Sequence, residues 1–315
     1  MTVASILLVY AASVGTVGSR MLGRARWAAR APLLGIVIYL AAAWSVVAAL
    51  GLAGLTLAVH ATALGGGLSH LIGACVLRLR SAYATPGGAT VAGLGLTLAG
   101  AVMARTAVTA ATHVRAVRRQ AVLHAQTARL VGRSDPDLGA MLVDHAQPVA
   151  YCVAGPHPTV ILTTAVLQAL DPDQVDAVLA HERAHLASHH HRLLAIARIG
   201  RQVLPFLPLM RVAETQITRL VEMHADDAAT AGRNTGPLAA ALVVLAAAAG
   251  PTPGLAAATT DAVQRIQRLL RPAEPLSRLR RQLLGAGAAV LALTPLLLAL
   301  TPAIVAVALG HVPVA

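Results

Sequence analysis

The chain has 315 residues, of which 57% are hydrophobic and 12% charged, and its mean hydropathy of +0.68 excludes an ordinary soluble globular protein. The net charge of +12 comes from arginine alone, but aromatic residues make up only 2% and many arginines flank apolar runs, so we expect no direct binding of nucleic acid. The two cysteines, Cys75 and Cys152, are far apart and indicate neither a disulfide framework nor a Cys-x-x-Cys metal site.

Four apolar segments are long enough to cross a lipid bilayer. Three of them, at about 2–18, 32–59 and 88–104, form a predicted membrane domain over residues 1–112. The fourth lies in residues 282–315, which also include a short tail. All acidic residues fall between Asp135 and Glu274, so residues 113–281 are predicted to form an aqueous domain.

The loop between the first two spans predicts the orientation. It carries four arginines, Arg20, Arg24, Arg26 and Arg30, and is therefore expected in the cytoplasm. Counting spans from this loop places 113–281 in the cytoplasm of a multi-pass cell-membrane protein. A further apolar stretch, 61–77, would move the domain outside if it crossed; we favour an outer loop or a re-entrant segment, because a crossing places the arginine clusters around the domain on the wrong side.

The aqueous domain is predicted to be α+β. A basic helix continues the third span to about residue 132, and β-rich runs at 141–143, 149–153 and 159–163 predict a small sheet with a hairpin. Asp171, Pro172 and Gln174 are typical of a capped helix start. Further helices are expected at about 211–230, 237–249 and 261–270.

The capped helix contains His181-Glu182-Arg183-Ala184-His185, a His-Glu-x-x-His pattern. Residues four apart lie on one helical face, close enough for two imidazoles to bind one Zn²⁺. Glu182, next to His181, can then reach a water at the metal without being a ligand. The pattern predicts a zinc hydrolase.

Glu222 is the favoured third ligand, and Asp226, one turn later, is placed to accept the N–H of a ligand histidine. His191 has the metzincin spacing, but Ser188 stands where that pattern needs glycine. His224 is a further alternative on the helix of Glu222. The run His189-His190-His191 is expected to be exposed to solvent or to face the substrate.

Residues 171–185, the preceding 158–163 and Glu222-x-x-x-Asp226 together resemble the integral-membrane gluzincin peptidases. Three spans before the domain and one after it resemble the M56 branch, which includes the β-lactam and methicillin-resistance sensor peptidases; the related M48 branch shares the motifs. The resemblance implies a mostly α membrane protein with a zincin-like α+β metallopeptidase domain between its third and fourth spans. It also implies that His181, His185 and Glu222 bind Zn²⁺ and that Glu182 is the general base. Asp226 would then contact a ligand histidine without binding the metal itself.

The expected function is a membrane-embedded zinc-dependent endopeptidase that cleaves a cytosolic regulator, such as a transcriptional repressor, in signalling. The sequence ends at Ala315, without the penicillin-binding domain of the β-lactam receptors, so we expect no β-lactam sensing in their way. A peptide or protein substrate is expected to add a strand beside Tyr151, Cys152 and Val153. Alternatives are an M48-type quality-control protease and a catalytically silent membrane scaffold; the scaffold is considered because Arg183 is charged and the sensor domain is missing. The oligomeric state stays open.

Overall fold

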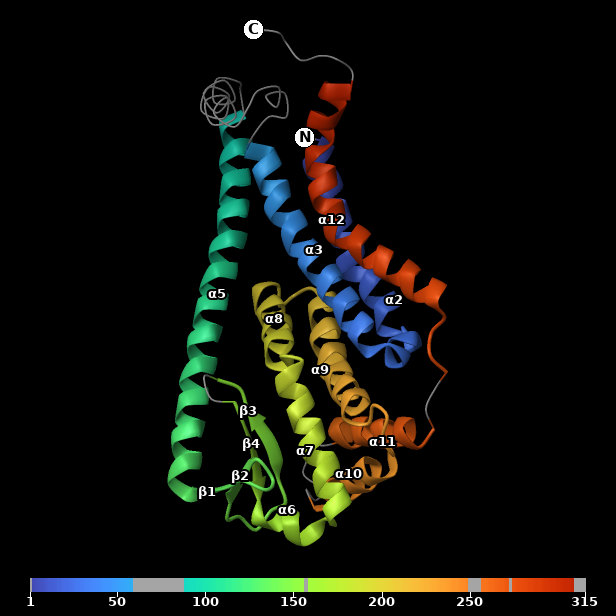
Figure 1. Cartoon of the computed structure of the whole chain (residues 1–315). Helices are drawn as coiled ribbons and strands as arrows, with labels where there is room; N and C mark the ends of the chain where they lie inside the picture. Colours follow the sequence, from blue (N-terminus) through green and yellow to red (C-terminus); the bar gives the residue numbers. More distant parts are fainter. Residues whose placement is uncertain (1, 59–87, 156–157, 249–255, 272–273, 309–315) are drawn as a thin grey trace.

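The computed structural model describes residues 2–58, 88–155, 158–248, 256–271 and 274–308. Long helices form one end of the molecule, and shorter helices with a small sheet form the other (Figure 1). The long helices are α1 (Thr2–Ser13), which continues through a π-helical turn, η1 (Val14–Gly18), into α2 (Ser19–Gly23), then α3 (Pro32–Ala58), α5 (Gly88–Val131) and α12 (Arg278–Ala308).

The four predicted spans are helices in the structure. By length and composition, the helical stretches Val3–Gly23, Pro32–Ala58, Thr90–Leu123 and Arg278–Thr301 are apolar and long enough to cross a membrane. The third is the long helix α5, whose 44 residues extend about 66 Å at the ~1.5 Å rise per residue of an α-helix. Its basic lower half is the predicted continuation of the third span.

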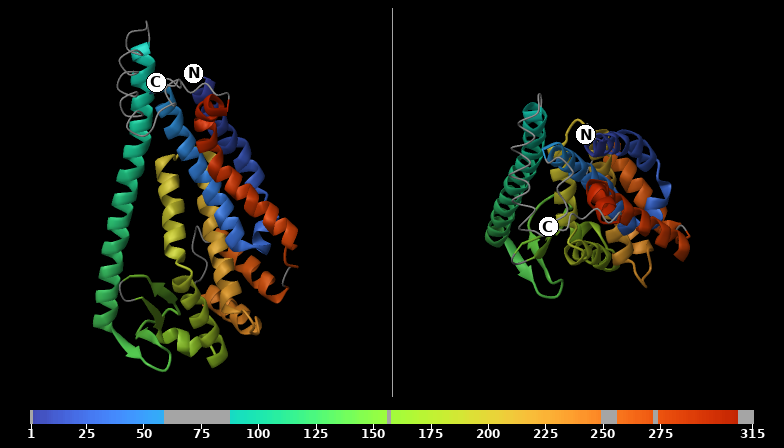
Figure 2. Two further views of the ribbon diagram at one scale, coloured as in Figure 1. Left: turned by 45° about the horizontal axis from the view of Figure 1, so that its top comes forward. Right: turned by 90° about the horizontal axis from the view of Figure 1, so that it is seen from above.

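The long helices pack around α3, which contacts α1, α5 and α12 (Figures 1 and 2). The Tyr10 hydroxyl lies 3.0 Å from Ser45 Oγ and 3.1 Å from the Leu291 carbonyl oxygen, so it joins α1, α3 and α12. Gly54 and Gly95 face each other where α3 crosses α5, and a Cβ on either would lie 2.6 Å from backbone of the other helix. Glycine is needed there for the close approach.

The directions of the helices place the arginine-bearing loop and the mixed α/β part at the same end of the bundle (Figure 1). This loop contains a 3₁₀ turn, η2 (Arg26–Arg30). The C-terminal end of α3 and the N-terminal end of α5 lie together at the opposite end. The stretch 61–77, for which an outer loop or re-entrant segment was predicted, lies outside the described residues.

A four-stranded sheet follows α5, in the order β1-β2-β4-β3. Outer strand β1 (Gly132–Asp135) pairs antiparallel with β2 (Ala140–Val143), β2 pairs parallel with β4 (Thr159–Thr163), and β3 (Ala150–Val153) pairs antiparallel with β4. The β3–β4 pair is the predicted hairpin. Strand β1 was not predicted, because its polar residues lack the pattern of a buried strand. Strand β3, which carries the predicted substrate-binding residues, is an edge strand within this sheet.

Six helices of the described residues complete the domain. The capping box at Asp171 and Gln174 is present: each side chain accepts a hydrogen bond from the other residue's backbone N–H, at 2.9 and 3.3 Å. The helices are α6 (Thr164–Ala169), α7 (Pro172–Ala187), α8 (His190–Val203), α9 (Pro208–Ala229), α10 (Gly236–Ala248) and α11 (Ala256–Leu270). Of these, α7, α9, α10 and α11 were predicted, whereas α6 and α8 were not.

The hairpin of α8 and α9 shares a hydrophobic core with the long helices. Leu7 of α1 and Tyr39 of α3 are buried in one cluster with Val203, Leu209 and Ile217 of the hairpin. The guanidinium of Arg105 on α5 also donates hydrogen bonds of 2.7 Å to the carbonyl oxygens of Val203 and Gln202. The predicted membrane domain and the predicted aqueous domain are therefore joined by a continuous core; the boundary at residue 112 remains a prediction.

Candidate metal centre

Helices α7 and α9 bring three predicted ligands together. His181 and His185 occupy one face of α7, and Glu222 approaches them from α9, which packs against α7. His181 Nε2 lies 3.1 Å from His185 Nε2 and 3.5 Å from Glu222 Oε2, and His185 Nε2 lies 3.6 Å from Glu222 Oε1. All three side chains offer their ligand atoms to one point.

These distances fit a zinc ion. A tetrahedral Zn²⁺ with bonds of about 2.0–2.1 Å holds neighbouring ligand atoms about 3.3 Å apart. Two imidazoles and one carboxylate are also the ligand set of a catalytic zinc site, which leaves the fourth position open. The chain thus has a donor set of the right chemistry at the right spacing.

Asp226 lies behind His181, on the side away from the ligand atoms. The Nδ1 of His181 is 3.0 Å from Asp226 Oδ1, although the ring is turned so that the contact is not a well-aligned hydrogen bond. Asp226 is 1% exposed and His181 is 6% exposed. A carboxylate in this position fixes the orientation of a ligand histidine. Asp226 therefore lies where the sequence predicted it, behind a ligand histidine.

Arg265 of α11 completes this side of the centre, and its position was not predicted. Its guanidinium holds Asp226 through two hydrogen bonds, from Nη2 to Oδ1 at 2.7 Å and from Nε to Oδ2 at 2.8 Å. Its Nη1 lies 3.0 Å from Glu222 Oε2, and its Nη2 lies 3.4 Å from His181 Nε2. In the sequence, Arg265 stands out only as a charged residue one turn before Leu269, on the buried face of an amphipathic helix. That pattern does not indicate that Asp226 is its partner.

The charges around the centre are balanced for a divalent cation. Glu182, Glu222 and Asp226 carry three negative charges when ionised, and Arg265 carries one positive charge. Burial opposes ionisation of Asp226, but the contacts from Arg265 and His181 hold its pKa at about 2. Burial also works against the charged form of His181, yet Asp226 and Glu222 raise its pKa to about 9. Around neutral imidazoles the remaining charge is minus two, which Zn²⁺ neutralises.

His185 is the first of three histidines linked in a chain. His190 Nδ1 lies 3.0 Å from His185 Nδ1, and His190 Nε2 lies 2.8 Å from His224 Nδ1. A metal on His185 Nε2 leaves Nδ1–H to donate to His190, whose Nε2–H then donates to His224. Burial lowers the pKa values of both His185 and His190 to about 4, which fits this neutral arrangement.

The prediction for the histidine run after α7 was wrong for one of its members. His190 is 1% exposed instead of facing solvent or substrate, whereas His191 is exposed. The reason is His189, whose φ of 51° places it in the left-handed region between α7 and α8. This turn points His190 back at His185, and a run of three identical residues gives no indication of which one turns inward.

Glu182 lies on α7 beside the metal ligands and contacts β3. The Cys152 thiol is hydrogen-bonded to Glu182, and burial together with that carboxylate raises the pKa of Cys152 to about 12, so the thiol stays protonated. Burial is also the main cause that raises the pKa of Glu182. Of the predicted substrate-binding residues, Cys152 thus faces α7, whereas Val153 is buried beside Ile161 and Tyr151 is exposed.

Arg183, between the two histidines in sequence, does not point into the centre. Its Nη2 donates a 2.6 Å hydrogen bond to the Leu138 carbonyl oxygen in the turn between β1 and β2. Gly139 in the same turn has a φ of +55°, and a Cβ there would lie 3.1 Å from the Arg183 guanidinium. The charged residue inside the motif therefore joins α7 to the sheet.

In a comparison with known families, the model of peptidase family M48 matches residues 113–273. The matched segment contains every residue of the centre described above. No curated protein and no solved structure matches the chain. The match supports a zinc metallopeptidase related to M48; the M56 branch, which the layout of the spans resembles, remains a prediction.

Proposed function

The chain belongs to peptidase family M48, and on that premise we propose that it is a membrane-embedded zinc endopeptidase that cleaves membrane or misfolded polypeptides at the bilayer surface. The observation that carries the peptidase assignment is the convergence of His181 Nε2, His185 Nε2 and Glu222 on one point, next to the carboxylate of Glu182.

The residues of the chain divide the chemistry between them. His181, His185 and Glu222 would hold Zn²⁺, which when bound supplies a Lewis acid that acidifies a water and polarises the peptide carbonyl. Glu182 takes the proton of the attacking water and passes it to the leaving amine. Its burial favours the proton uptake, because a raised pKa favours the protonated carboxyl that forms when Glu182 takes the proton.

The substrate is proposed to bind along β3. This edge strand carries Cys152, whose thiol touches Glu182, so a polypeptide paired with the backbone of Tyr151–Val153 would pass beside the general base. Addition of a strand to a sheet edge binds the peptide backbone with little dependence on side chains. That mode suits a protease with many substrates.

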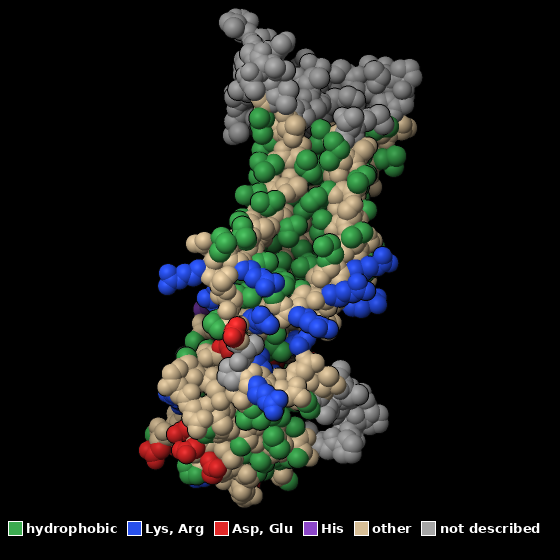
Figure 3. Space-filling model, turned by 90° about the vertical axis from the view of Figure 1, so that its right-hand side faces the viewer, with side chains coloured by type: hydrophobic (Ala, Val, Ile, Leu, Met, Phe, Trp, Pro, Cys, Tyr) green, Lys and Arg blue, Asp and Glu red, His purple; other side chains and the backbone are tan. Residues whose placement is uncertain are grey.

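The shared core of α8, α9 and the long helices supports a site close to the membrane. Apolar side chains cover the upper part of the face in Figure 3, and arginines gather in a band below it. By the positive-inside rule, this band supports a cytoplasmic location of the peptidase domain. A site joined to the spans in this way can reach polypeptide segments that emerge from the bilayer.

The test compares cells that carry the full-length wild type with cells that carry Glu182→Gln, and follows every protein whose size or amount changes. We expect the variant to keep its zinc and to accumulate uncleaved membrane or misfolded proteins. A single soluble regulator as the only changed protein would overturn the substrate class in favour of a signalling peptidase. Unchanged proteolysis with zinc retained would instead identify a catalytically silent scaffold.

A further inference from the structure

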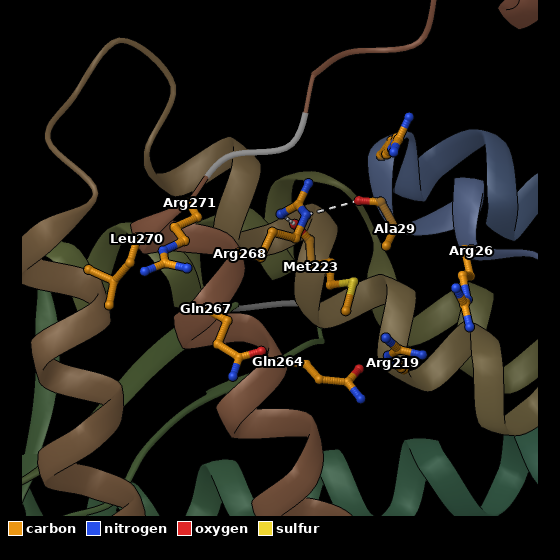
Figure 4. A pocket seen from close by; sticks show the side chains of 10 residues that line it. Arg26, Ala29, Arg219, Met223, Gln264, Gln267, Arg268, Leu270 and Arg271 are labelled. Atoms are coloured by element: carbon orange, nitrogen blue, oxygen red, sulfur yellow. Dashed lines mark hydrogen bonds between the residues drawn. The ribbon is translucent and has the colours of Figure 1, made fainter.

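A basic cavity of about 810 Å³ lies between η2, α9 and α11 (Figure 4). Among the described residues, no Asp or Glu lines it. Gln264 and Gln267 lie between Arg271 at one side and Arg26 and Arg219 at the other. The lining arginines are Arg26, Arg30, Arg219, Arg268 and Arg271.

Only part of this positive charge is neutralised by the protein. Arg268 donates to Asp227 Oδ2 at 2.6 Å and to the Ala29 carbonyl oxygen at 2.9 Å, which ties α11 to the loop after the first span. Arg219 Nε is 3.8 Å from Asp261 Oδ1, a long and half-exposed contact.

The other three lining arginines have no such partner. Throughout the described part of the chain, no ion pair or hydrogen bond is made by the guanidinium groups of Arg26, Arg30 and Arg271. Guanidinium groups around one cavity repel each other, so an anion bound between them is stabilised.

The lining selects the chemistry of that anion. A guanidinium matches the oxygens of a phosphate in a two-pronged geometry, and several guanidiniums can share one phosphate group. Gln264 and Gln267 add neutral donors, while Met223 and Leu270 supply an apolar wall. The combination fits a phosphate ester with an apolar part better than a small inorganic anion.

The position of the cavity identifies the source of the phosphate. Turn η2, which contributes Arg26 and Arg30, connects the first two spans at their lower end (Figure 1). In the proposed membrane placement this is the depth of the lipid headgroups, where basic pockets between helices bind anionic lipids. We propose that the cavity binds the phosphate headgroup of an anionic phospholipid of the cytoplasmic leaflet.

Helix α11 connects this site to the metal centre. Arg268 lines the cavity, and Arg265, three residues earlier on the same helix, holds Asp226 and Glu222. A headgroup bound to Arg268 and Arg271 anchors the helix from which Arg265 acts. Anionic lipid therefore stabilises the zinc-binding arrangement. This effect on the metal centre rests on the proposed function, whereas the binding of lipid in the cavity rests only on the proposed membrane placement.

The test uses purified full-length protein and native mass spectrometry with phosphatidylglycerol, phosphatidylcholine and inorganic phosphate as separate probes. The double variant Arg30→Gln/Arg271→Gln removes two unpaired lining charges. Arg24→Gln/Arg278→Gln is the matched control, since it removes the same charge near the same ends of the spans without touching the cavity.

We expect wild type and control to prefer phosphatidylglycerol to phosphatidylcholine, and the lining variant to bind it about tenfold more weakly. Equal loss in lining variant and control would overturn the site in favour of general surface charge. Binding of inorganic phosphate without any preference for phosphatidylglycerol would overturn the lipid as its source.

The coupling has its own measurement, the rate of zinc loss to a chelator in nanodiscs. Phosphatidylglycerol is expected to slow the loss from wild type and control, relative to phosphatidylcholine, but not from the lining variant. Equal rates in both lipids would overturn the coupling alone. Specific lipid binding in a protein that cleaves nothing would refute the proposed peptidase function and leave the lipid site intact.

Discussion

Arg265 and Asp226 form a buried two-pronged ion pair, with Nη2 to Oδ1 at 2.7 Å and Nε to Oδ2 at 2.8 Å, across 39 residues of sequence. It joins α11, near the end of the peptidase domain, to the residue that backs the metal ligand His181. Arg265→Gln leaves the Asp226 carboxylate, which is 1% exposed, without its counter-charge. We expect a loss of roughly 3–5 kcal/mol in unfolding free energy, measured by chemical denaturation in detergent.

The matched variant separates the pair from the loss of packing. In Arg265→Gln/Asp226→Asn the buried charge of Asp226 is removed together with its partner, so part of the lost stability should return. If the double variant is as unstable as the sum of its single variants, the two side chains do not act as a pair.

His190 is expected to control zinc affinity through His185. Its Nδ1 lies 3.0 Å from His185 Nδ1, and His190→Ala removes the acceptor that orients this ligand. Loss of such a partner usually weakens metal binding about 10–100-fold. Competition with a fluorescent chelator measures the effect, and His191→Ala, which changes an exposed neighbour, should bind zinc as the wild type does. An equal loss of zinc affinity in both variants would show that His190 does not orient His185.

Zinc binding should tighten as the pH rises. In the metal-free protein, burial opposes the charged form of His181, but Asp226 and Glu222 raise its pKa to about 9. Zinc needs the neutral imidazole, so between pH 7 and 9 the apparent affinity should increase about tenfold per pH unit and then level off. Asp226→Asn removes one of the two carboxylates that raise the pKa of His181. The pH at which the zinc affinity stops increasing should therefore be lower in this variant. A flat profile in the wild type would contradict the raised pKa.

Arg183 is expected to serve stability rather than catalysis. Its guanidinium bonds the Leu138 carbonyl oxygen in the β1–β2 turn and lies outside the group of metal ligands. Arg183→Gln should cost about 1 kcal/mol of stability and leave kcat within about twofold. The measurement is peptide cleavage beside thermal unfolding. A hundredfold loss of kcat with zinc retained would place Arg183 at the substrate.

The local features of the site were accessible from the sequence because they depend on residues a few positions apart. The four-residue spacing of His181 and His185 fixes their common face once α7 forms, and the capping box at Asp171 fixes where α7 begins. The apolar runs likewise predicted four helices long enough to cross a membrane.

The tertiary structure decided which distant side chains meet at those ligands. Arg265 lies 84 residues from His181, and His224 lies 34 residues from His190, yet both contacts complete the centre. Such pairs follow from the packing of α9 against α7 and α8 and of α11 against α9, for which no sequence period exists. The sequence by itself therefore determined the metal-binding face and its ligand types. Only the packing of the helices decided that the buried Arg265 would balance the negative charge of the centre. It also decided that a chain of histidines would orient the ligand His185.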